Sequence, residues 1–340
     1  MNQIHSFIAF CNSFFSLLSD YRHNKQLLKN TNDLLLLEVL KTKQDFFQEK
    51  EIKRIRFYTS FAPVFAGYTY STLRGFPITN KEHSLMAKLS ILTPVFDDYF
   101  DEEGSDVEKL KSMINASTSH ISSNAKENFC VSFYKKLQDQ VHDKKGLKEN
   151  IYAVFAAQQE GKTFQASTTK ESFKKNTFDK GGYAALLYRN MLDHPIKKGE
   201  QEAIRSLGGM IQWLDDIFDI YEDNQAGIYT IPNTATDAYL LAKDYEEGLK
   251  EMIVLFKNLG YKKKDTDLFL NKLMIVFVRG LVCLEKLKIT QDKYGEGFRP
   301  FDYERKDLIC DMEKVSNLYK LYRYFSVYHK QMRNGADLQY

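Results

Sequence analysis

Hydrophobic residues recur at helical spacing along almost the whole chain, and no segment sustains the apolar–polar alternation that builds a strand. The pattern predicts helices over these ranges: 32–73, 81–102, 107–120, 126–142, 147–167, 168–193, 198–233, 235–258, 264–290 and 304–331. A further amphipathic helix is expected in the N-terminal segment "MNQIHSFIAFCNSFFSLL". The chain therefore reads as helical from end to end.

Proline and glycine interrupt the first part of this pattern at a few places. Pro63 predicts an interruption within 32–73, and the Gly, Pro and Asn residues of 73–83 predict a loop. Gly104 stands where a glycine would end the helix over 81–102.

Two later segments carry glycine pairs or terminal signals. In 168–193, Gly181–Gly182 predicts a break that divides the segment into a helix pair. By contrast, 198–233 is expected to be one long helix, with Gly227 near its end and Pro232 just beyond.

Composition agrees with a helical globular protein. The 340 residues include only 17 Gly and 6 Pro, and 43% are hydrophobic against 27% charged. We find no internal repeat, low-complexity linker or domain boundary. The prediction is a single all-α domain over 1–340, with a core of about 30–330.

Charge and cysteine usage narrow the class of protein. A net charge of +3, from 48 basic and 45 acidic residues, is too balanced for a nucleic-acid surface. The four cysteines show no CxxC spacing, which favours reduced thiols in the cytoplasm over a zinc site or disulfide framework. The N-terminal segment lacks a basic leader and no segment approaches transmembrane length, so no stable membrane span is expected.

Two aspartate-rich clusters stand out within hydrophobic surroundings. The first, "TPVFDDYFDEEGSD" at 93–106, carries Asp97, Asp98 and Asp101 in a DDxxD pattern. The second, within 198–233, repeats that pattern at 215–219 and continues to Asp223. Asp and Glu are rarely buried unpaired, so each cluster is either a solvated helix surface or a cation site.

The second cluster places its aspartates on one face of the predicted helix. At about 100° per residue from Gln212, the four aspartates lie at about −60°, +40°, −20° and +20°: Asp215, Asp216, Asp219 and Asp223. Like charges at i,i+4 destabilise a helix, and no Lys or Arg stands among them. Clusters made only of carboxylates suit the hard cations Mg²⁺ or Ca²⁺, and the spacing is not that of an EF-hand loop. Mg²⁺, completed by waters and phosphate oxygens, would satisfy such a cluster.

The paired motifs resemble those of the class I isoprenoid synthases. The segment "DIYEDNQAGIYTIP" (219–232) is similar to the second motif of squalene and phytoene synthases. The segments "KGGYAALL" (180–187) and "GGMIQWLDDIFDIYEDNQAGIYT" (208–230) resemble large bacterial terpene synthases of the tetraprenyl-β-curcumene synthase type. The resemblance covers about residues 60–330 and implies a single-domain helical bundle with a central active-site cavity.

The resemblance also implies roles for particular residues. Two sets of aspartates, on opposite sides of the active site, would hold three Mg²⁺ ions with the substrate diphosphate. One set is Asp97, Asp98 and Asp101, and the other is Asp215, Asp219 and Asp223. Asp216 would be a ligand or a neighbour of one. The expected substrate-binding residues are Lys174, Lys175, Lys180, Arg323, Tyr324, Phe96, Gln212 and Trp213. The Gly181–Gly182 break would aim carbonyl groups into the pocket, whereas Gly208–Gly209 would do the same or permit close helix packing.

Departures from the family pattern indicate which reaction to expect. Ile228 and Pro94–Val95–Phe96 stand where squalene and phytoene synthases carry arginines for head-to-head condensation. The sequence therefore favours a carbon–oxygen lyase that ionises one linear prenyl diphosphate. The sequence leaves the substrate length open between C15 and C25 or longer, and we take C20 as the expectation. The products are a terpene hydrocarbon or alcohol and diphosphate.

Three alternatives remain at this stage. A chain-elongating or condensing prenyltransferase would share the fold, but "EEGSDVEKLKS" (102–112) lacks the paired arginines that follow the first motif in elongating enzymes. A non-catalytic helical isoprenoid-binding protein would not need both acidic motifs. A di-iron protein or phosphohydrolase is disfavoured, since no His stands near either cluster. The expected partner is the small-molecule substrate, and the expected state is a monomer or homodimer.

Overall fold

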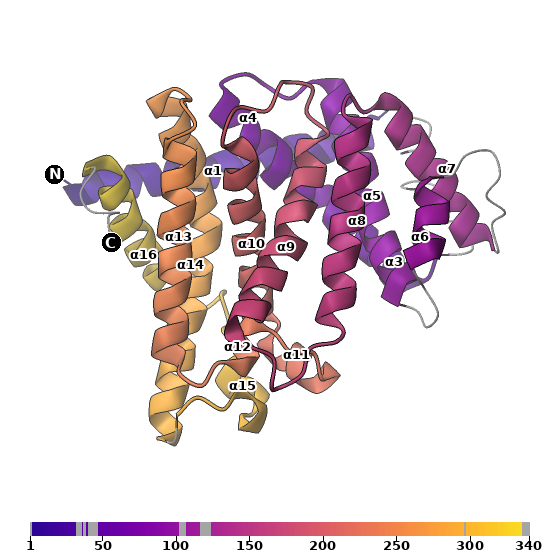
Figure 1. Ribbon diagram of the computed structural model, residues 1–340. Coiled ribbons are helices and arrows are strands. Elements are labelled where there is room, and N and C mark those ends of the chain that lie inside the picture. Colours follow the sequence, from indigo (N-terminus) through magenta and orange to yellow (C-terminus); the bar gives the residue numbers. More distant parts are fainter. Residues whose placement is uncertain are drawn as a thin grey trace. The chain divides into compact units, whose positions relative to one another are not determined.

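The computed structural model describes residues 2–31, 36, 39, 47–101, 107–115, 124–295 and 297–334, without the side chains of 2, 98–101, 107 and 334. Within these residues every regular element is a helix and none is a strand (Figure 1). The all-α prediction is therefore confirmed. None of the described helices is long and apolar enough to cross a membrane.

The chain divides into two compact units that are interleaved along the sequence. Unit 1 consists of Met1–Ser16, Asn150–Leu186 and Ile196–Tyr340, and unit 2 of Leu17–Glu149 and Leu187–Pro195. Three helices run from one unit into the other: α1 (Asn2–Lys29), α8 (Lys144–Gly161) and α9 (Lys170–Arg189). The single domain over 1–340 stays a prediction.

Unit 2 is built on the packing of α3 against α5. Its other elements are η1 (Pro63–Tyr68), α4 (Thr69–Arg74), α6 (Val107–Ile114) and α7 (Ala125–Gln140), beside α3 (Glu49–Ala62) and α5 (Asn80–Asp101). A buried ion pair joins Arg74 to Glu82, with both oxygens of Glu82 accepting at 2.7 and 2.8 Å. Arg74 thereby ties the end of α4 to the first turn of α5.

The interruption predicted at Pro63 is a π-helical turn. Proline lacks the N–H that an α-helix requires, so the chain widens from Pro63 to Tyr68 before α4 resumes. Gly75 then ends α4 in the left-handed conformation, with φ of 78°, which confirms the predicted loop. Gly104 lies outside the described residues.

Unit 1 is organised around the long helix α14. Its elements are α10 (Glu200–Phe218), α11 (Ile220–Ala226), α12 (Ile231–Thr234), α13 (Ala238–Lys257), α14 (Lys263–Tyr294), η2 (Pro300–Asp302), α15 (Arg305–Leu308) and α16 (Val315–Asn334). Helices α10, α13 and α16 all pack against α14, whose Phe269, Met274 and Phe277 are fully buried (Figure 1). The predicted segment 304–331 is two helices, α15 and α16, because residues 309–314 leave the helical conformation.

The predicted break at Gly181–Gly182 is wrong, because α9 is continuous from Lys170 to Arg189. A Cβ atom on Gly181 would collide with the carbonyl oxygen of Gly208 in α10, and a Cβ on Gly208 would collide with that of Gly181. The glycines therefore allow two helix backbones to meet. For Gly208–Gly209, the close-packing alternative is confirmed.

The prediction of one long helix over 198–233 is also wrong. Helix α10 ends at Phe218, and Asp219 adopts φ −94° and ψ 10° before α11 begins at Ile220. The helical C-terminal signal at Gly227 is confirmed, since Gly227 is left-handed at φ 68°.

We expect Gly181→Ala to lower the free energy of unfolding by about 1–3 kcal/mol, because the added methyl group meets a backbone that has no room to shift. Denaturant unfolding of the purified variant measures this. Gly161→Ala, whose added atom would lie 3.2 Å from the flexible Asn176 side chain, is the control. Equal stability of the two variants would contradict the role given to the glycine contact.

Candidate functional site

The second acidic cluster lies at the junction of α10 and α11 in unit 1. The N–H of Asp219 donates to the carbonyl of Asp215 at 2.9 Å, and the N–H of Asp223 donates to that of Asp219 at 2.8 Å. Because of these two i→i−4 hydrogen bonds, the residues keep helical spacing across the junction between α10 and α11. Asp215, Asp219 and Asp223 therefore lie one turn apart, as predicted, although the helix is not continuous.

Asp216 is the cluster's buried member. Gln212 donates to one of its carboxylate oxygens at 2.8 Å, and the hydroxyl of Thr177 in α9 donates to the other at 3.3 Å. Burial raises the pKa of Asp216 to about 6, with a further rise from Asp215, while Gln212 and Lys180 oppose the shift. Both oxygens are held by the protein, so Asp216 is fixed in orientation.

The other three aspartates carry raised pKa values for the same physical reasons. Burial raises the pKa of Asp219 to about 6 and that of Asp223 to about 7, and neighbouring carboxylates add to both shifts. The pKa of Asp215 is raised by burial, against the influence of Lys180. Asp215 and Asp219 remain open to solvent, although dense protein surroundings disfavour their charged forms.

Lys180 of α9 is the predicted basic residue that acts on this cluster. Its charge lowers the pKa values of Asp215, Asp216 and Asp223. Lys175 is instead exposed and paired with Asp179, at 2.7 Å. Lys174 lies 6.0 Å from the ring centroid of Phe178. The structure thus separates Lys180 from the other two predicted lysines.

Asn224 also belongs to this site, and its pattern in the sequence did not predict a role for it. Its side-chain N–H donates to the carbonyl of Pro300 at 2.9 Å, which joins α11 to η2. Its side-chain oxygen is buried and has no hydrogen-bond partner among the described residues. The only sequence signal was its position directly after Asp223.

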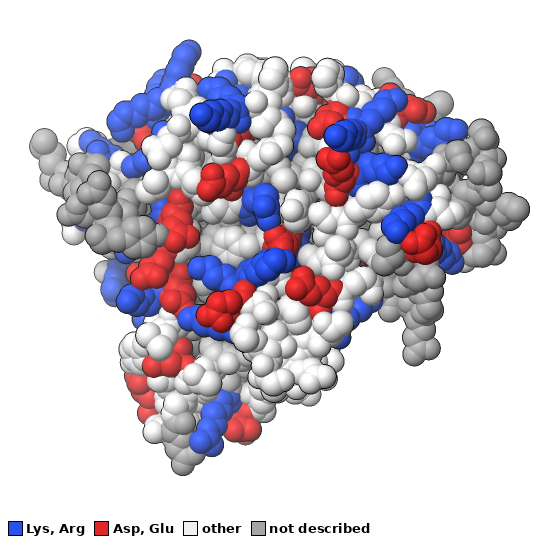
Figure 2. All heavy atoms as spheres, in the orientation of Figure 1, with Lys and Arg blue, Asp and Glu red and all other residues white. Residues whose placement is uncertain are grey.

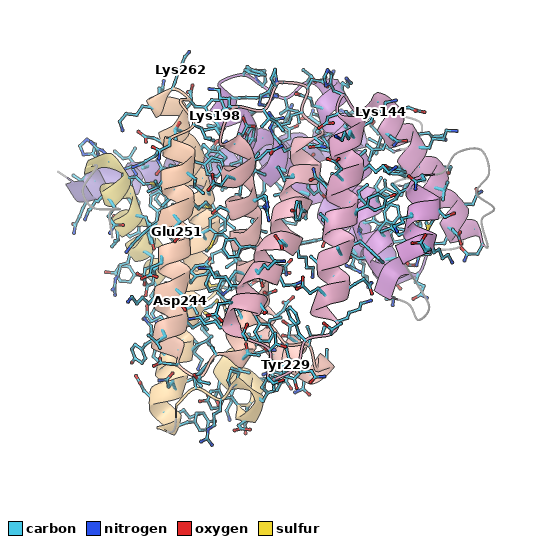
Figure 3. The ribbon with its side chains drawn as sticks, viewed as in Figure 1. Lys144, Lys198, Tyr229, Asp244, Glu251 and Lys262 are labelled. Atoms are coloured by element: carbon cyan, nitrogen blue, oxygen red, sulfur yellow. The ribbon has the colours of Figure 1, made fainter. Side chains whose placement is uncertain are left out.

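The neighbouring turn is fixed by aromatic and hydroxyl contacts. The hydroxyl of Thr230 donates to Asp223 at 3.4 Å. The ring of Tyr229, labelled in Figure 3, is tilted against that of Phe301, with the centroids 5.7 Å apart. Glu222 points elsewhere, since it is exposed and lies 3.5 Å from Arg305. These contacts hold the turn between α11 and α12 against η2 and α15.

Trp213 is a core residue in this structure. It is 1% exposed, and its ring lies edge-on to Phe178 and Tyr245, with centroids 6.1 and 5.6 Å away. Its indole N–H has no acceptor among the described residues. A substrate-lining role for Trp213 stays a prediction.

The predicted pair Arg323–Tyr324 lies on α16. The hydroxyl of Tyr324 donates to Glu285 of α14 at 3.0 Å, and Lys320 pairs with the same carboxylate at 2.8 Å. Arg323 is exposed. Tyr324 thus links α16 to α14, and its contact with a diphosphate stays a prediction.

The first acidic cluster lies at the C-terminal end of α5 in unit 2. Asp97 is half-buried and lies 3.4 Å from the guanidinium of Arg54 in α3. Phe96 is also half-buried, whereas the side chains of Asp98 and Asp101 lie outside the described ones. The sequence analysis missed Arg54, because 43 residues separate it from Asp97.

The residues at the α10–α11 junction suit a hard cation. Among the described residues, no three His, Cys, Asp or Glu side chains form an arrangement that could hold a metal ion by themselves. Mg²⁺ is usually bound by one or two carboxylates, with waters and substrate phosphates as the other ligands. Carboxylates with raised pKa values and the unpaired Asn224 oxygen fit that requirement.

We expect the stability of the protein to fall as pH rises from about 4 to about 7. The folded-state pKa of Asp223 is raised to about 7, so the folded protein binds more protons than the unfolded chain over that interval. Asp223→Asn should reduce the slope by up to about 1.4 kcal/mol per pH unit. Urea unfolding at several pH values measures it. The exposed Asp139→Asn should leave the slope unchanged, and an equal effect of both substitutions would contradict the argument.

Comparison with known proteins gives no assignment: the chain matches no protein-family model, no curated protein and no solved structure.

Proposed function

We propose that the protein is a Mg²⁺-dependent class I terpene synthase. Its substrate is a linear prenyl diphosphate, best C20 and otherwise C15 to C25 or longer, and its products are a terpene hydrocarbon or alcohol and diphosphate. The observation that carries the proposal is the row of Asp215, Asp219 and Asp223 at one-turn spacing, with their pKa values raised. The resemblance of both acidic motifs to the squalene/phytoene synthase-like enzymes supports it.

When bound, Mg²⁺ neutralises the leaving diphosphate and lowers the barrier to heterolysis of the allylic C–O bond. The protein's part is to supply deprotonated oxygen ligands. Asp219 and Asp223, with pKa values of about 6 and about 7, are mostly deprotonated only above these pH values, so metal binding is favoured at neutral pH and above.

Other residues position this ligand row and add charge. Gln212 and Thr177 hold Asp216, which fixes the end of α10. Lys180 adds the positive charge that acts on the cluster and would attract the diphosphate. In unit 2, Asp97, Asp98 and Asp101 are the proposed second ligand set, and Arg54 keeps positive charge beside Asp97.

The surrounding features agree with a cytoplasmic enzyme. All four cysteines are free, which supports reduced thiols in that compartment. On the face drawn in Figure 2, positive and negative side chains are interspersed, which gives no support to a nucleic-acid partner.

We expect Asp219→Ala to lower product formation by at least about 100-fold, because it removes a ligand of the Mg²⁺ that would neutralise the leaving diphosphate. Asp98→Ala tests the first motif in the same way. The assay incubates the purified protein and Mg²⁺ with geranyl, farnesyl, geranylgeranyl or geranylfarnesyl diphosphate, with and without isopentenyl diphosphate, and analyses the products.

Glu222→Gln is the matched control, because Glu222 is in the same cluster but faces Arg305. It should keep near-wild-type turnover. A longer diphosphate formed only with isopentenyl diphosphate would assign a chain-elongating enzyme instead. No turnover of any substrate would favour a non-catalytic isoprenoid-binding protein.

We expect Mg²⁺ with inorganic diphosphate to stabilise the wild-type protein by about 2.7 kcal/mol at 100 times the dissociation constant. The apparent affinity should weaken as pH falls from about 7 to about 6, because protons compete for Asp219 and Asp223. Thermal unfolding at each pH measures both effects. Equal stabilisation of Asp219→Ala and Asp223→Ala variants would place the ions elsewhere.

A further inference from the structure

The first half of α1 exposes most of its large apolar side chains and buries two serines. Five large hydrophobic residues are about half exposed or more: Ile4 (65%), Phe7 (55%), Ile8 (50%), Phe14 (48%) and Phe15 (63%). At about 100° per residue they share a face about 120° wide. Ser6 and Ser13 point the opposite way and are 0% and 5% exposed. This arrangement is the reverse of a helix that stabilises a core.

Helix α16 has a second exposed apolar stretch in its first two turns. Val315, Leu318 and Tyr319 are 81%, 51% and 62% exposed. All belong to unit 1, as does the first half of α1.

Tyr322 joins the two stretches. Its ring lies edge-on to those of Phe7 and Phe10, with centroids 5.7 and 5.6 Å away, and its hydroxyl donates to the carbonyl of Gln3 at 3.3 Å. Phe10 also packs against Phe325, and the start of α1 lies beside α16 in Figure 1. The two helices therefore form one surface, here called the α1–α16 surface. Contiguous exposed apolar side chains on a protein surface mark sites of interaction with a partner or a membrane.

Over residues 2–19 and 315–334, the two helices contribute Lys and Arg but no Asp or Glu. Residues 2–19 of α1 contain no Asp, Glu, Lys or Arg, and α16 contains Lys320, Arg323, Lys330 and Arg333 but no Asp or Glu. At about 100° per residue, Lys330 and Arg333 lie within about 80° of Val315, Tyr319 and Tyr322. Arg333 is exposed and Lys330 half-buried. Aromatic and aliphatic side chains beside basic ones match the acyl and anionic headgroup layers of a bilayer.

We propose that the α1–α16 surface binds the protein to a membrane that contains anionic lipids. The two helices lie in the plane of the interface: the exposed Phe and Ile side chains enter the acyl boundary, while Lys330 and Arg333 contact headgroups. A hydrophobic partner protein or a second copy would also cover apolar side chains, but the basic charge of Lys330 and Arg333 beside them favours an anionic lipid surface.

The test is flotation of the full-length protein with vesicles of phosphatidylcholine alone or mixed with phosphatidylglycerol. We expect the wild-type protein to float with the mixed vesicles. The triple variant Ile4→Ser, Ile8→Ser, Phe15→Ser should bind the mixed vesicles at least about tenfold more weakly, because it removes exposed aliphatic and aromatic surface that would enter the bilayer. Lys330→Gln with Arg333→Gln should weaken binding to the anionic vesicles by about tenfold, without an effect on neutral ones.

The matched control replaces three exposed apolar residues of α13 and α14 with serine: Leu240, Leu268 and Ile289. It should float as the wild type does, and circular dichroism checks that each variant folds. Equal loss in the control and the α1 variant would overturn the proposal. A second result would also overturn it: the wild-type protein fails to float and is a dimer in light scattering, whereas the α1 variant is a monomer. The α1–α16 surface would then join two copies of the protein. Neither readout requires activity, so the result is independent of the proposed reaction.

Discussion

Repulsion among the carboxylates at the α10–α11 junction is the constraint on which the candidate site depends. Burial raises the pKa values of Asp219 and Asp223 toward neutrality, and neighbouring carboxylates add to both shifts: Asp215 and Glu222 for Asp219, and Asp216 and Asp219 for Asp223. A helix would not keep such a row by local preference, because like charges at this spacing destabilise it. The tertiary structure must hold the row in place, and a bound cation would relieve it.

The contact between α9 and α10 provides that support. Because Gly181 and Gly208 lack side chains, the two backbones meet, and this contact brings Thr177 and Lys180 to Asp216. At its N-terminal end, α9 is further joined to α13 by an ion pair between Lys170 and Asp244, the latter labelled in Figure 3 two turns from Glu251. The positive charge beside the acidic cluster is thus a consequence of a close helix contact.

Unit 2 and the α1–α16 surface show the same dependence on long-range contacts. Arg54 lies beside Asp97 of the first acidic motif, since α3 packs against α5. In α1, the apolar face is evident from the sequence, but its direction is not. Contact with Tyr322 and Phe325 turns Ser6 and Ser13 inward and leaves the Phe and Ile side chains in solvent.

The sequence by itself determined the helical content, the end signals at Gly75 and Gly227 and the one-turn spacing of Asp215, Asp219 and Asp223, because these follow from local hydrogen bonds and side-chain periodicity. Only the tertiary structure decided that Gly181 packs rather than breaks a helix, that α10 ends before Asp219, that Arg54 lies beside Asp97, and that Asn224 bonds to Pro300. A glycine has the same local backbone preference whether it breaks a helix or lets two helices meet, and a charged residue has the same local preference whether or not a partner lies beside it. The role of either residue depends on which distant backbone or side chain approaches it, and that is a property of packing.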